Sequence, residues 1–260
     1  MLRAVIADER IESGRDPAIV PFRSNHVDPP QMTVWRIDLH CHTSRSYDGW
    51  TTPTELVRRA RAAALDRICV TDHGNMRGAL EASRIDTELV IPGQEIRCAT
   101  GIELIGIGLS EPVAEGRSVS ETAAMIREQG ALVYAPHPFA YARHGSLRAA
   151  LSIEAADIVE VFNPRAFLPS WNRDAADAAA RAGKAMAASS DAHFPWEIGR
   201  SYTEVQPFET ISELATRIRS GRPVHDSRTS WSCHLLSVSL GGTRRLTAAT
   251  VRREATRMKS

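Results

Sequence analysis

The stretch IDLHCHTSRSYDG, which runs from Ile37 to Gly49, sets the expectation for the rest of the chain. It continues an alternating apolar pattern, TVWR, that is typical of a half-buried strand. Histidine is not among the residues that strands favour, yet His40 and His42 both fall inside this run. Residues two apart on a strand point to the same face, so the two imidazoles lie together while Cys41 points the other way. The stretch therefore predicts a strand that ends in a chelating pair.

Apolar runs and helical runs alternate about seven times along the chain. This alternation is typical of parallel βα units, and the number of repeats favours a closed or distorted barrel over an open sheet. Strands are expected at TVWRIDLH, RICVTDHG, LVIPGQEIRC, IELIGIGL, ALVYAPHP, DIVEVFN and KAMAASSDAH. Helices are expected at TPTELVRRARAAALD, SVSETAAMIREQG, WNRDAADAAARAG and TISELATRIRSG.

Two of these helices carry the signature of a capping box, in which a Ser or Thr and a Glu three residues later satisfy each other's backbone N–H groups. The first box pairs Thr52 with Glu55, and the second pairs Ser118 with Glu121. Gly130 is the expected stop of the second helix.

The composition is that of an ordinary globular domain, with 43% hydrophobic and 24% charged residues among 260. A formal net charge of +1 gives no basic field that would favour nucleic acid, and no apolar run approaches the roughly 20 residues that a membrane helix needs. The four cysteines form no CxxC pair and the N-terminus lacks a signal peptide's apolar core, so a cytoplasmic location is expected. We expect an N-terminal extension over residues 1–32, one catalytic domain over 33–228, and a basic tail over 229–260 that is solvated or partly packed on the barrel.

Nearly every expected strand carries a His or a carboxylate at its carboxyl-terminal end. In a parallel barrel these ends converge, so the side chains are expected to share one site. A single histidine on an apolar strand is more often a core residue, but five of the nine histidines occupy such positions. Imidazole and carboxylate together suit Zn, Mn or Fe rather than Ca. The residues are Asp38, His40, His42, Asp72, His73, Glu95, His137, Asp191 and His193.

Five motifs, DLHCHT, TDHG, GQEI, APHPF and SSDAH, resemble in sequence and order those of the PHP (polymerase and histidinol phosphatase) family. The resemblance covers about residues 33–208. It implies an α/β fold, a distorted (β/α)7 barrel, with two or three divalent metal ions (Mn, Fe or Zn) and hydrolysis of phosphoesters.

The family's ligands, carried over residue by residue, fall into three sets, of which the first two share Glu95 as a bridge. The implied sets are His40, His42, Glu95 and Asp191; Glu95 with His137; and Asp48, His73 and His193.

The chain departs from the family pattern at Glu103, in IELIGIG, where the family usually has a His. As a ligand, Glu103 would make the second site more anionic and favour Mn or Fe over Zn. The alternative is a carboxylate at the rim that leaves the second site weak.

The expected nucleophile is a hydroxide that bridges two metals, because metal binding lowers the pKa of water to near 7. His193 or His73 is expected to protonate the leaving oxygen, and Asp38 to orient an imidazole. Arginines and an asparagine that follow the expected strand ends are candidates for binding phosphate, since arginine matches phosphate oxygens bidentately. They are Arg143, Asn163, Arg165 and Arg200, of which Arg200 is also the candidate for neutralising charge in the transition state.

The chain is therefore expected to be a phosphatase or phosphodiesterase acting on a small phosphorylated metabolite or nucleotide. Only forty-one residues separate Glu95 from His137, which leaves little room for the cap found in family members that act on nucleoside bisphosphates. We therefore expect a more open site, or one capped by the N-terminal extension or the C-terminal tail. One alternative is a histidinol-phosphate-type phosphatase. Another is a metal-binding module without catalysis that serves as an interaction surface, against which the nearly complete ligand set argues.

Overall fold

The computed structural model describes residues 33–140 and 145–225, and side chains over 33–140 and 147–225. The expected N-terminal extension and basic tail lie outside the described residues, as does Arg143. The domain limits predicted from the sequence stay a prediction. Among the described residues, none of the helices has the length and apolar character needed to cross a bilayer.

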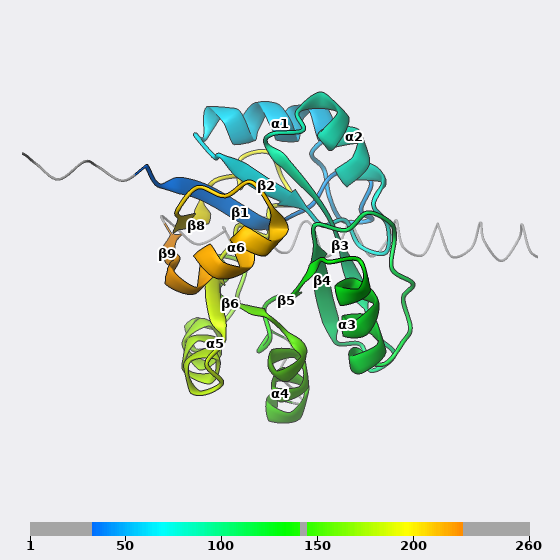
Figure 1. Ribbon diagram of the computed structural model, residues 1–260, viewed down its shortest axis with the longest axis vertical. Coiled ribbons are helices and arrows are strands. Elements are labelled where there is room, and N and C mark those ends of the chain that lie inside the picture. Colours follow the sequence, from blue (N-terminus) through cyan, green and yellow to red (C-terminus); the bar gives the residue numbers. More distant parts are fainter. Residues whose placement is uncertain (1–32, 141–144, 226–260) are drawn as a thin grey trace, which may run out of the picture. The chain divides into compact units, whose positions relative to one another are not determined.

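The described residues form one nine-stranded sheet in the order β7-β6-β5-β4-β3-β2-β1-β8-β9 (Figure 1). Strands β1 to β3 are parallel to one another, and so are β5 to β7, while β4, β8 and β9 each run antiparallel to their neighbours. The strands are β1 (Trp35–Cys41), β2 (Arg67–Val70), β3 (Val90–Arg97), β4 (Glu103–Ile107), β5 (Leu132–Ala135), β6 (Ile158–Phe162), β7 (Ala185–Ala188), β8 (Ser201–Val205) and β9 (Arg222–His225).

The sheet curls until its two ends nearly meet. Beyond β7, the backbone N–H of Asp191 donates to the carbonyl of His40 in β1 at 2.8 Å, and that of His42 donates to Ala192 at 2.9 Å. A second link joins β8 to β7. The hydroxyl of Thr203 accepts a hydrogen bond from the backbone N–H of Ala188 at 2.9 Å and donates one to the carbonyl oxygen of Ala188 at 3.0 Å. The expected distorted barrel is therefore confirmed, with a sheet that is nearly closed.

Helices α1 and α2 lie side by side over strands β1 to β3 (Figure 1). The capping box at Ser118 is present in full. At Thr52 it is incomplete, since Glu55 turns its carboxylate toward Arg58 and Arg59. The helices are α1 (Pro53–Ala62), α2 (Arg77–Ile85), α3 (Val119–Glu128), α4 (Gly145–Ala155), α5 (Pro169–Arg181), α6 (Ile211–Arg217) and the short 3-10 helix η2 (Ile218–Ser220).

The sequence did not predict α2, α4, β8 or β9. Helix α2 lacks the signal that marked α1 and α3, because its N-cap is Met76, whose side chain caps nothing. Strand β9 is four residues long and contains Pro223, which fits only an edge strand.

The uniform parallel alternation predicted from the sequence is wrong at β4. Strand β3 turns directly into β4 without a helix, through a tight connection in which Cys98 N–H donates to Ile102 at 2.8 Å and Gly101 has φ +75°. In the resulting register Arg97 pairs with Glu103 and Glu95 with Ile105. The first residue of β4 therefore lies at the same end of the barrel as the last residues of β3.

Leu104 is fully buried in the core cluster that lies between β4, α3 and α5. Leu104→Ala should lower the free energy of unfolding by about 2–5 kcal/mol, through lost apolar burial and the cavity left behind. Leu147→Ala is the control: that side chain is 69% exposed, so its removal should change stability by less than about 0.5 kcal/mol. Urea unfolding of both variants checks the pair, and equal effects would mean that Leu104 is not in the core.

Candidate metal centre

The structure brings all nine predicted metal ligands together at the carboxyl end of the barrel, where the parallel strands finish. Their donor atoms form four overlapping groups, and within each group every atom lies within 4.8 Å of the others. The groups are His40, His42 and Asp191; His40, Glu95 and His137; His42, Asp48, His73 and His193; and His73, Glu95 and Glu103.

The spacing of the donor atoms of His40, His42 and Asp191 fits a single ion. The Nε2 atoms of His40 and His42 are 3.0 Å apart, and each is 3.4 Å from Oε2 of Glu95. Oδ1 of Asp191 is 3.4 Å from His40 Nε2 and 3.3 Å from His42 Nε2. Four atoms that each lie about 2.0–2.1 Å from a tetrahedral metal are roughly 3.3 Å from one another. One cation could therefore contact the two imidazoles and Asp191, which form one of the four groups, while Glu95 approaches the same imidazoles from a separate group.

A change of register in β1 helps to aim these side chains. The pairing of β1 with β2 shifts between Asp38 and Cys41, so β1 carries an extra residue there. Such bulges bend a strand and redirect its side chains, and they are frequent next to active sites.

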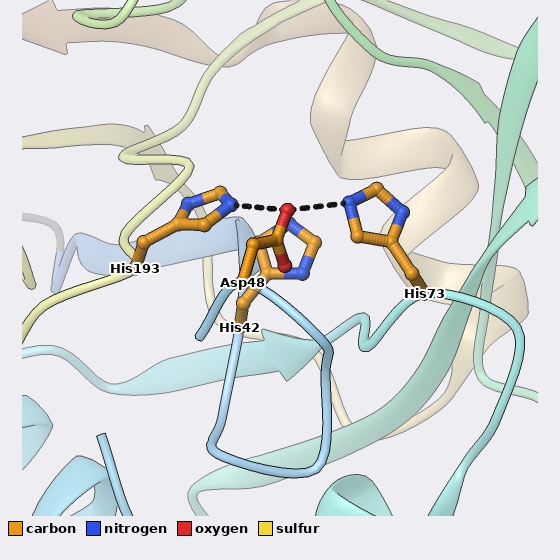
Figure 2. A group of neighbouring side chains, drawn as sticks. All are labelled: His42, Asp48, His73 and His193. Carbon is orange, nitrogen blue, oxygen red and sulfur yellow. Dashed lines mark ion pairs between the residues drawn. The ribbon is translucent and has the colours of Figure 1, made fainter. Parts of the chain in front are cut away.

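A second set of donors surrounds Asp48, as Figure 2 shows. Oδ2 of Asp48 lies 3.2 Å from Nε2 of His73 and 3.2 Å from Nε2 of His193. The Nδ1 atom of His193 is 2.8 Å from the carbonyl of Asp191. A carbonyl only accepts, so Nδ1 carries the hydrogen and Nε2 presents a lone pair to the centre.

Asp48 reaches the centre because the loop that follows β1 closes on itself. The backbone N–H of Ser44 donates to Thr51 at 2.7 Å, and the hydroxyl of Ser46 donates to Asp48 Oδ1 at 2.7 Å. Gly49 packs directly on the backbone of Thr43, where no side chain would fit.

Glu95 has the geometry of a bridge. Its Oε1 is 3.4 Å from Nε2 of His137, while its Oε2 faces His40 and His42 and is also 3.2 Å from Nδ1 of His73. Each oxygen thus belongs to a different group of donors.

Two ligand candidates are held in a backbone conformation that L-residues rarely adopt, with φ +29° at His137 and +47° at Asp191. His137 is fixed by a 2.7 Å hydrogen bond from its N–H to Glu160. Such conformations persist where surrounding contacts determine them, and they cluster at functional sites.

Glu103 stands at the edge of the centre, because β4 runs opposite to β3 and begins at this end. Its donor oxygen groups with Glu95 and His73. Its other near neighbour is Arg97, whose Nη1 is 4.0 Å away. Burial and the charge of Glu95 raise the pKa of Glu103.

The carboxylates of this site raise the pKa values of the histidines beside them. Burial lowers the pKa of His40, but Asp191, Glu160 and Glu95 outweigh it and keep that pKa well above its usual value. Burial also lowers the pKa values of His73 and His137, but nearby carboxylates, Glu95 among them, outweigh it and raise these values to about 10 and about 9.

The carboxylates respond in the opposite sense. Burial raises the pKa of Glu95, but the neighbouring charges of His73 and His40 outweigh burial and hold that pKa well below the usual range. The pKa values of Asp48 and Asp191 are lowered for the same reason. The centre therefore favours a cation, whether a proton or a metal ion.

Buried polar atoms without hydrogen bonds also fit a metal. Among the described residues, both carboxylate oxygens of Glu95 and Nδ1 of His42 are buried and have no hydrogen-bond partner. Most buried polar atoms in proteins are satisfied, so such groups need an explanation. Coordination of an ion by Glu95 supplies one, and the donor set as a whole is able to bind metal.

Sequence reasoning missed Glu160, which is buried in β6 beneath the centre. Its Oε1 lies 3.1 Å from Nδ1 of His40 and accepts from the hydroxyl of Tyr134 at 3.0 Å. Its position in the apolar strand DIVEVFN was the available signal, since a carboxylate in a core strand needs a partner. A carboxylate behind a metal-binding imidazole fixes its orientation and raises its basicity.

The expected role of Asp38 is wrong in its detail. Asp38 accepts hydrogen bonds from the backbone N–H groups of His40, at 3.3 Å, and Ser190, at 3.0 Å. It therefore supports the backbone, while Glu160 contacts the imidazole. Burial raises the pKa of Asp38 to about 7.

Asn163 and Arg165 lie beside the ligands and are already engaged. The amide of Asn163 donates to Glu160 at 2.9 Å and to Asp191 at 3.0 Å, which uses both of its hydrogens. Arg165 donates to Glu197 at 2.9 Å and lies 3.9 Å from Asp191. Both side chains are thus placed to position Asp191.

Arg200 is partly exposed, and its Nε donates to the carbonyl of Trp196 at 2.9 Å. Its predicted contact with phosphate stays a prediction, as do those of Asn163, Arg165 and Arg143.

The architecture and donor set are those of a nearly closed α/β barrel with a site that could hold metal ions. The sequence profile of the PHP domain matches residues 38–127, and the PHP-associated profile matches residues 169–223. The chain belongs to the PHP family.

Relatives with similar sequence support this assignment. Two are uncharacterised proteins of Methanocaldococcus jannaschii: one is 41% identical over 43% of this chain and 49% of its own length, the other 34% identical over 40% of this chain and 68% of its own. A third is the 3',5'-nucleoside bisphosphate phosphatase of Chromobacterium violaceum, 38% identical over 28% of this chain and 27% of the relative. The chain thus spans about half the length of the first relative and little more than a quarter of the third.

Solved structures share the fold. PsfC from Pseudomonas syringae aligns over 83% of this chain and 100% of its own with a TM-score of 0.59 and 15% identity. A Bifidobacterium adolescentis protein with the provisional name metal-dependent phosphoesterase aligns over 61% of this chain and 88% of its own, with a TM-score of 0.50 and 18% identity.

Replacing Glu160 tests the support beneath His40. In Glu160→Gln an amide NH2 must face either the N–H donors of His137 and Asn163 or the side of His40, so one contact becomes repulsive. We expect metal affinity to fall about 10- to 100-fold, the usual cost of losing such a partner. Tyr134→Phe is the control, because it removes one hydrogen bond to the same carboxylate and leaves His40 oriented. Titration against a chelating dye measures both variants, and wild-type affinity in Glu160→Gln would contradict the assigned role.

Replacing Glu103 separates a ligand from a rim carboxylate. If Glu103 is a ligand, Glu103→Ala should lose metal and about tenfold or more in activity, while Glu103→His should keep activity and shift preference toward Zn, a metal that suits imidazole. Metal content and kcat/KM with Mn, Zn and Fe give the answer. An alanine variant with unchanged metal content and rate would place Glu103 outside the coordination.

Proposed function

We propose that this protein hydrolyses a phosphoester of a small phosphorylated metabolite or nucleotide, with two or three divalent metal ions as cofactors. The observation that supports this most directly is the 3.0–3.4 Å spacing among the donor atoms of His40, His42 and Asp191, with Oε2 of Glu95 3.4 Å from both imidazoles. Membership of the PHP family and the similarity to a nucleoside bisphosphate phosphatase support the reaction class and a nucleotide substrate.

The proposed ligands are the nine residues of the centre, with Glu95 shared between ions. Five imidazoles and four carboxylates suit Mn, Fe or Zn. Bound divalent ions would supply Lewis acidity, which lowers the pKa of water and offsets the charge of the phosphoryl group.

The chain's own groups then orient the reaction. Asp191 is held by Asn163 and lies near Arg165, and the carbonyl of Asp191 fixes the ring of His193. We assign protonation of the leaving oxygen to His193 or His73, and charge neutralisation at the phosphate to Arg200. The connection between β3 and β5 holds only β4 and α3, which agrees with a site that takes small substrates without a separate cap.

Turnover tests the proposal together with metal content. Protein purified without chelator should contain at least about one metal ion per chain and hydrolyse p-nitrophenyl phosphate with added Mn. His40→Ala and Asp191→Ala should lose both metal and turnover. His225→Ala is the control, because that histidine lies on β9 outside the nine donors. Activity should also fall in acid, since ligating histidines must be neutral and carboxylates ionised.

A panel of nucleotides, nucleoside bisphosphates, sugar phosphates and histidinol phosphate identifies the substrate. Metal-loaded protein that hydrolyses none of these and no generic ester would contradict the proposed function and favour a module that binds metal without catalysis. Retained turnover in His40→Ala would show that the site is misplaced.

A further inference from the structure

The segment that follows β7 carries two candidate ligands, Asp191 and His193, outside the named strands. Its backbone is joined to β1 by the parallel bridge between Cys41 and Ala192, and from His193 to Arg200 it forms bends and turns. Pairing with a strand therefore ends before His193, and another contact has to hold this histidine in place.

Glu197 supplies that contact. Its side chain is buried, and its Oε2 accepts hydrogen bonds from the backbone N–H of His193 at 2.8 Å and from that of Phe194 at 3.0 Å. Nη1 of Arg165, a side chain that is also buried, donates to Oε1 at 2.9 Å. A buried carboxylate is costly unless hydrogen bonds and an opposite charge compensate it. These three donors do so, and they hold Glu197 against the start of the turn.

Three contacts then hold His193. Glu197 accepts from its backbone N–H, and its carbonyl accepts from the backbone N–H of Trp50 at 2.8 Å. The carbonyl of Asp191 lies 2.8 Å from Nδ1 of the ring. The other ring nitrogen, Nε2, points at Oδ2 of Asp48 across 3.2 Å, as Figure 2 shows. Backbone and ring are therefore fixed together, with one nitrogen directed into the centre.

Glu160 and Glu197 support different groups of donors. Glu160 lies 3.1 Å from the ring of His40, which groups with Asp191 and, separately, with Glu95. Glu197 holds His193, and the group to which that histidine belongs is named the Asp48 group; it consists of His42, Asp48, His73 and His193. Loss of one support is therefore expected to affect one set of donors more than the other.

We propose that Glu197 is a positioning residue for the Asp48 group, and that without Glu197 this group loses its ion while the donors around His40 keep theirs. Glu197 acts through the backbone N–H of His193 and makes no bond to the ion. The inference rests on the metal-binding part of the proposed function and makes it more specific, because it assigns a buried carboxylate outside the nine donors to one ion.

Metal content of Glu197→Gln is the first test. Glutamine cannot accept from the N–H of His193 with one atom and from Arg165 with the other, so one contact becomes repulsive. Affinity of the Asp48 group for its ion should fall about tenfold or more, within the range seen for residues that orient ligands. Elemental analysis of Mn-loaded, dialysed protein should find about one ion per chain fewer than in wild type, with the other ions retained.

Glu197→Ala removes all three hydrogen bonds and should lose at least as much metal as Glu197→Gln. The glutamine variant has nearly the same size and shape as wild type, so it decides the metal test even where the alanine variant does not fold.

Asp157 offers a matched control at the other end of the barrel. Its Oδ1 accepts from Nη2 of Arg127 at 2.7 Å and its Oδ2 from the backbone N–H of Val133 at 2.9 Å, so it joins an arginine to a backbone amide as Glu197 does. It precedes the first residue of β6, whereas the donors lie at the carboxyl ends of the parallel strands. Asp157→Asn and Asp157→Ala should lower the melting temperature and leave the metal content unchanged.

The ring of His193 gives a readout apart from metal content and turnover. In zinc-loaded wild type, long-range proton–nitrogen NMR spectra should show the proton of this ring on Nδ1, because the carbonyl of Asp191 accepts there. The signal should move or broaden in Glu197→Ala and stay unchanged in Asp157→Ala.

Four results would overturn the inference. They are unchanged metal content in Glu197→Gln, loss of every ion in that variant, an equal loss of metal in Asp157→Asn, and unchanged His193 signals in Glu197→Ala. The expected loss of metal in a protein that hydrolyses no phosphoester would overturn the proposed function alone.

Discussion

Four carboxylates and five imidazoles meet at one end of the barrel, and the need of buried carboxylates for positive charge is the constraint on which the rest depends. A buried carboxylate is costly unless a cation or hydrogen-bond donors compensate it. Here the carboxylates raise the pKa values of His40, His73 and His137, which shows how strongly the site favours positive charge. A divalent ion meets the same need, and the donor atoms of His40, His42 and Asp191 already have the spacing that one ion requires.

A layer of hydrogen bonds beneath the centre holds the donors in place. Glu160 links His40, Tyr134, the backbone of His137 and Asn163, and Asn163 links it in turn to Asp191. The layer joins β5, β6 and the segment after β7 to β1. Candidate ligands from distant parts of the chain therefore depend on one buried carboxylate, Glu160, which holds them through hydrogen bonds.

The reversal of β4 shapes the edge of the centre. A helix between β3 and β4 would have placed Glu103 at the opposite end of the barrel. The direct turn brings Glu103 opposite Arg97 and leaves Gly101 beneath Arg148. One local feature of topology thus supplies a ninth donor and two guanidinium groups next to it.

The sequence by itself determined the barrel class, the strand-end positions of seven donors and the capped helices, because spacing along the chain fixes side-chain direction within a strand and the signals at helix ends are local. It did not determine the direction of β4, the existence of α2, α4, β8 and β9, or the role of Glu160. Strand direction follows from pairing between distant segments, and α2 carries no local start signal. Glu160 reads as an isolated acid in an apolar run, and only the tertiary structure brings it to His40, which lies 120 residues away in the sequence. The contacts that position the ligands were decided by the closed sheet, because they join residues that no local pattern connects.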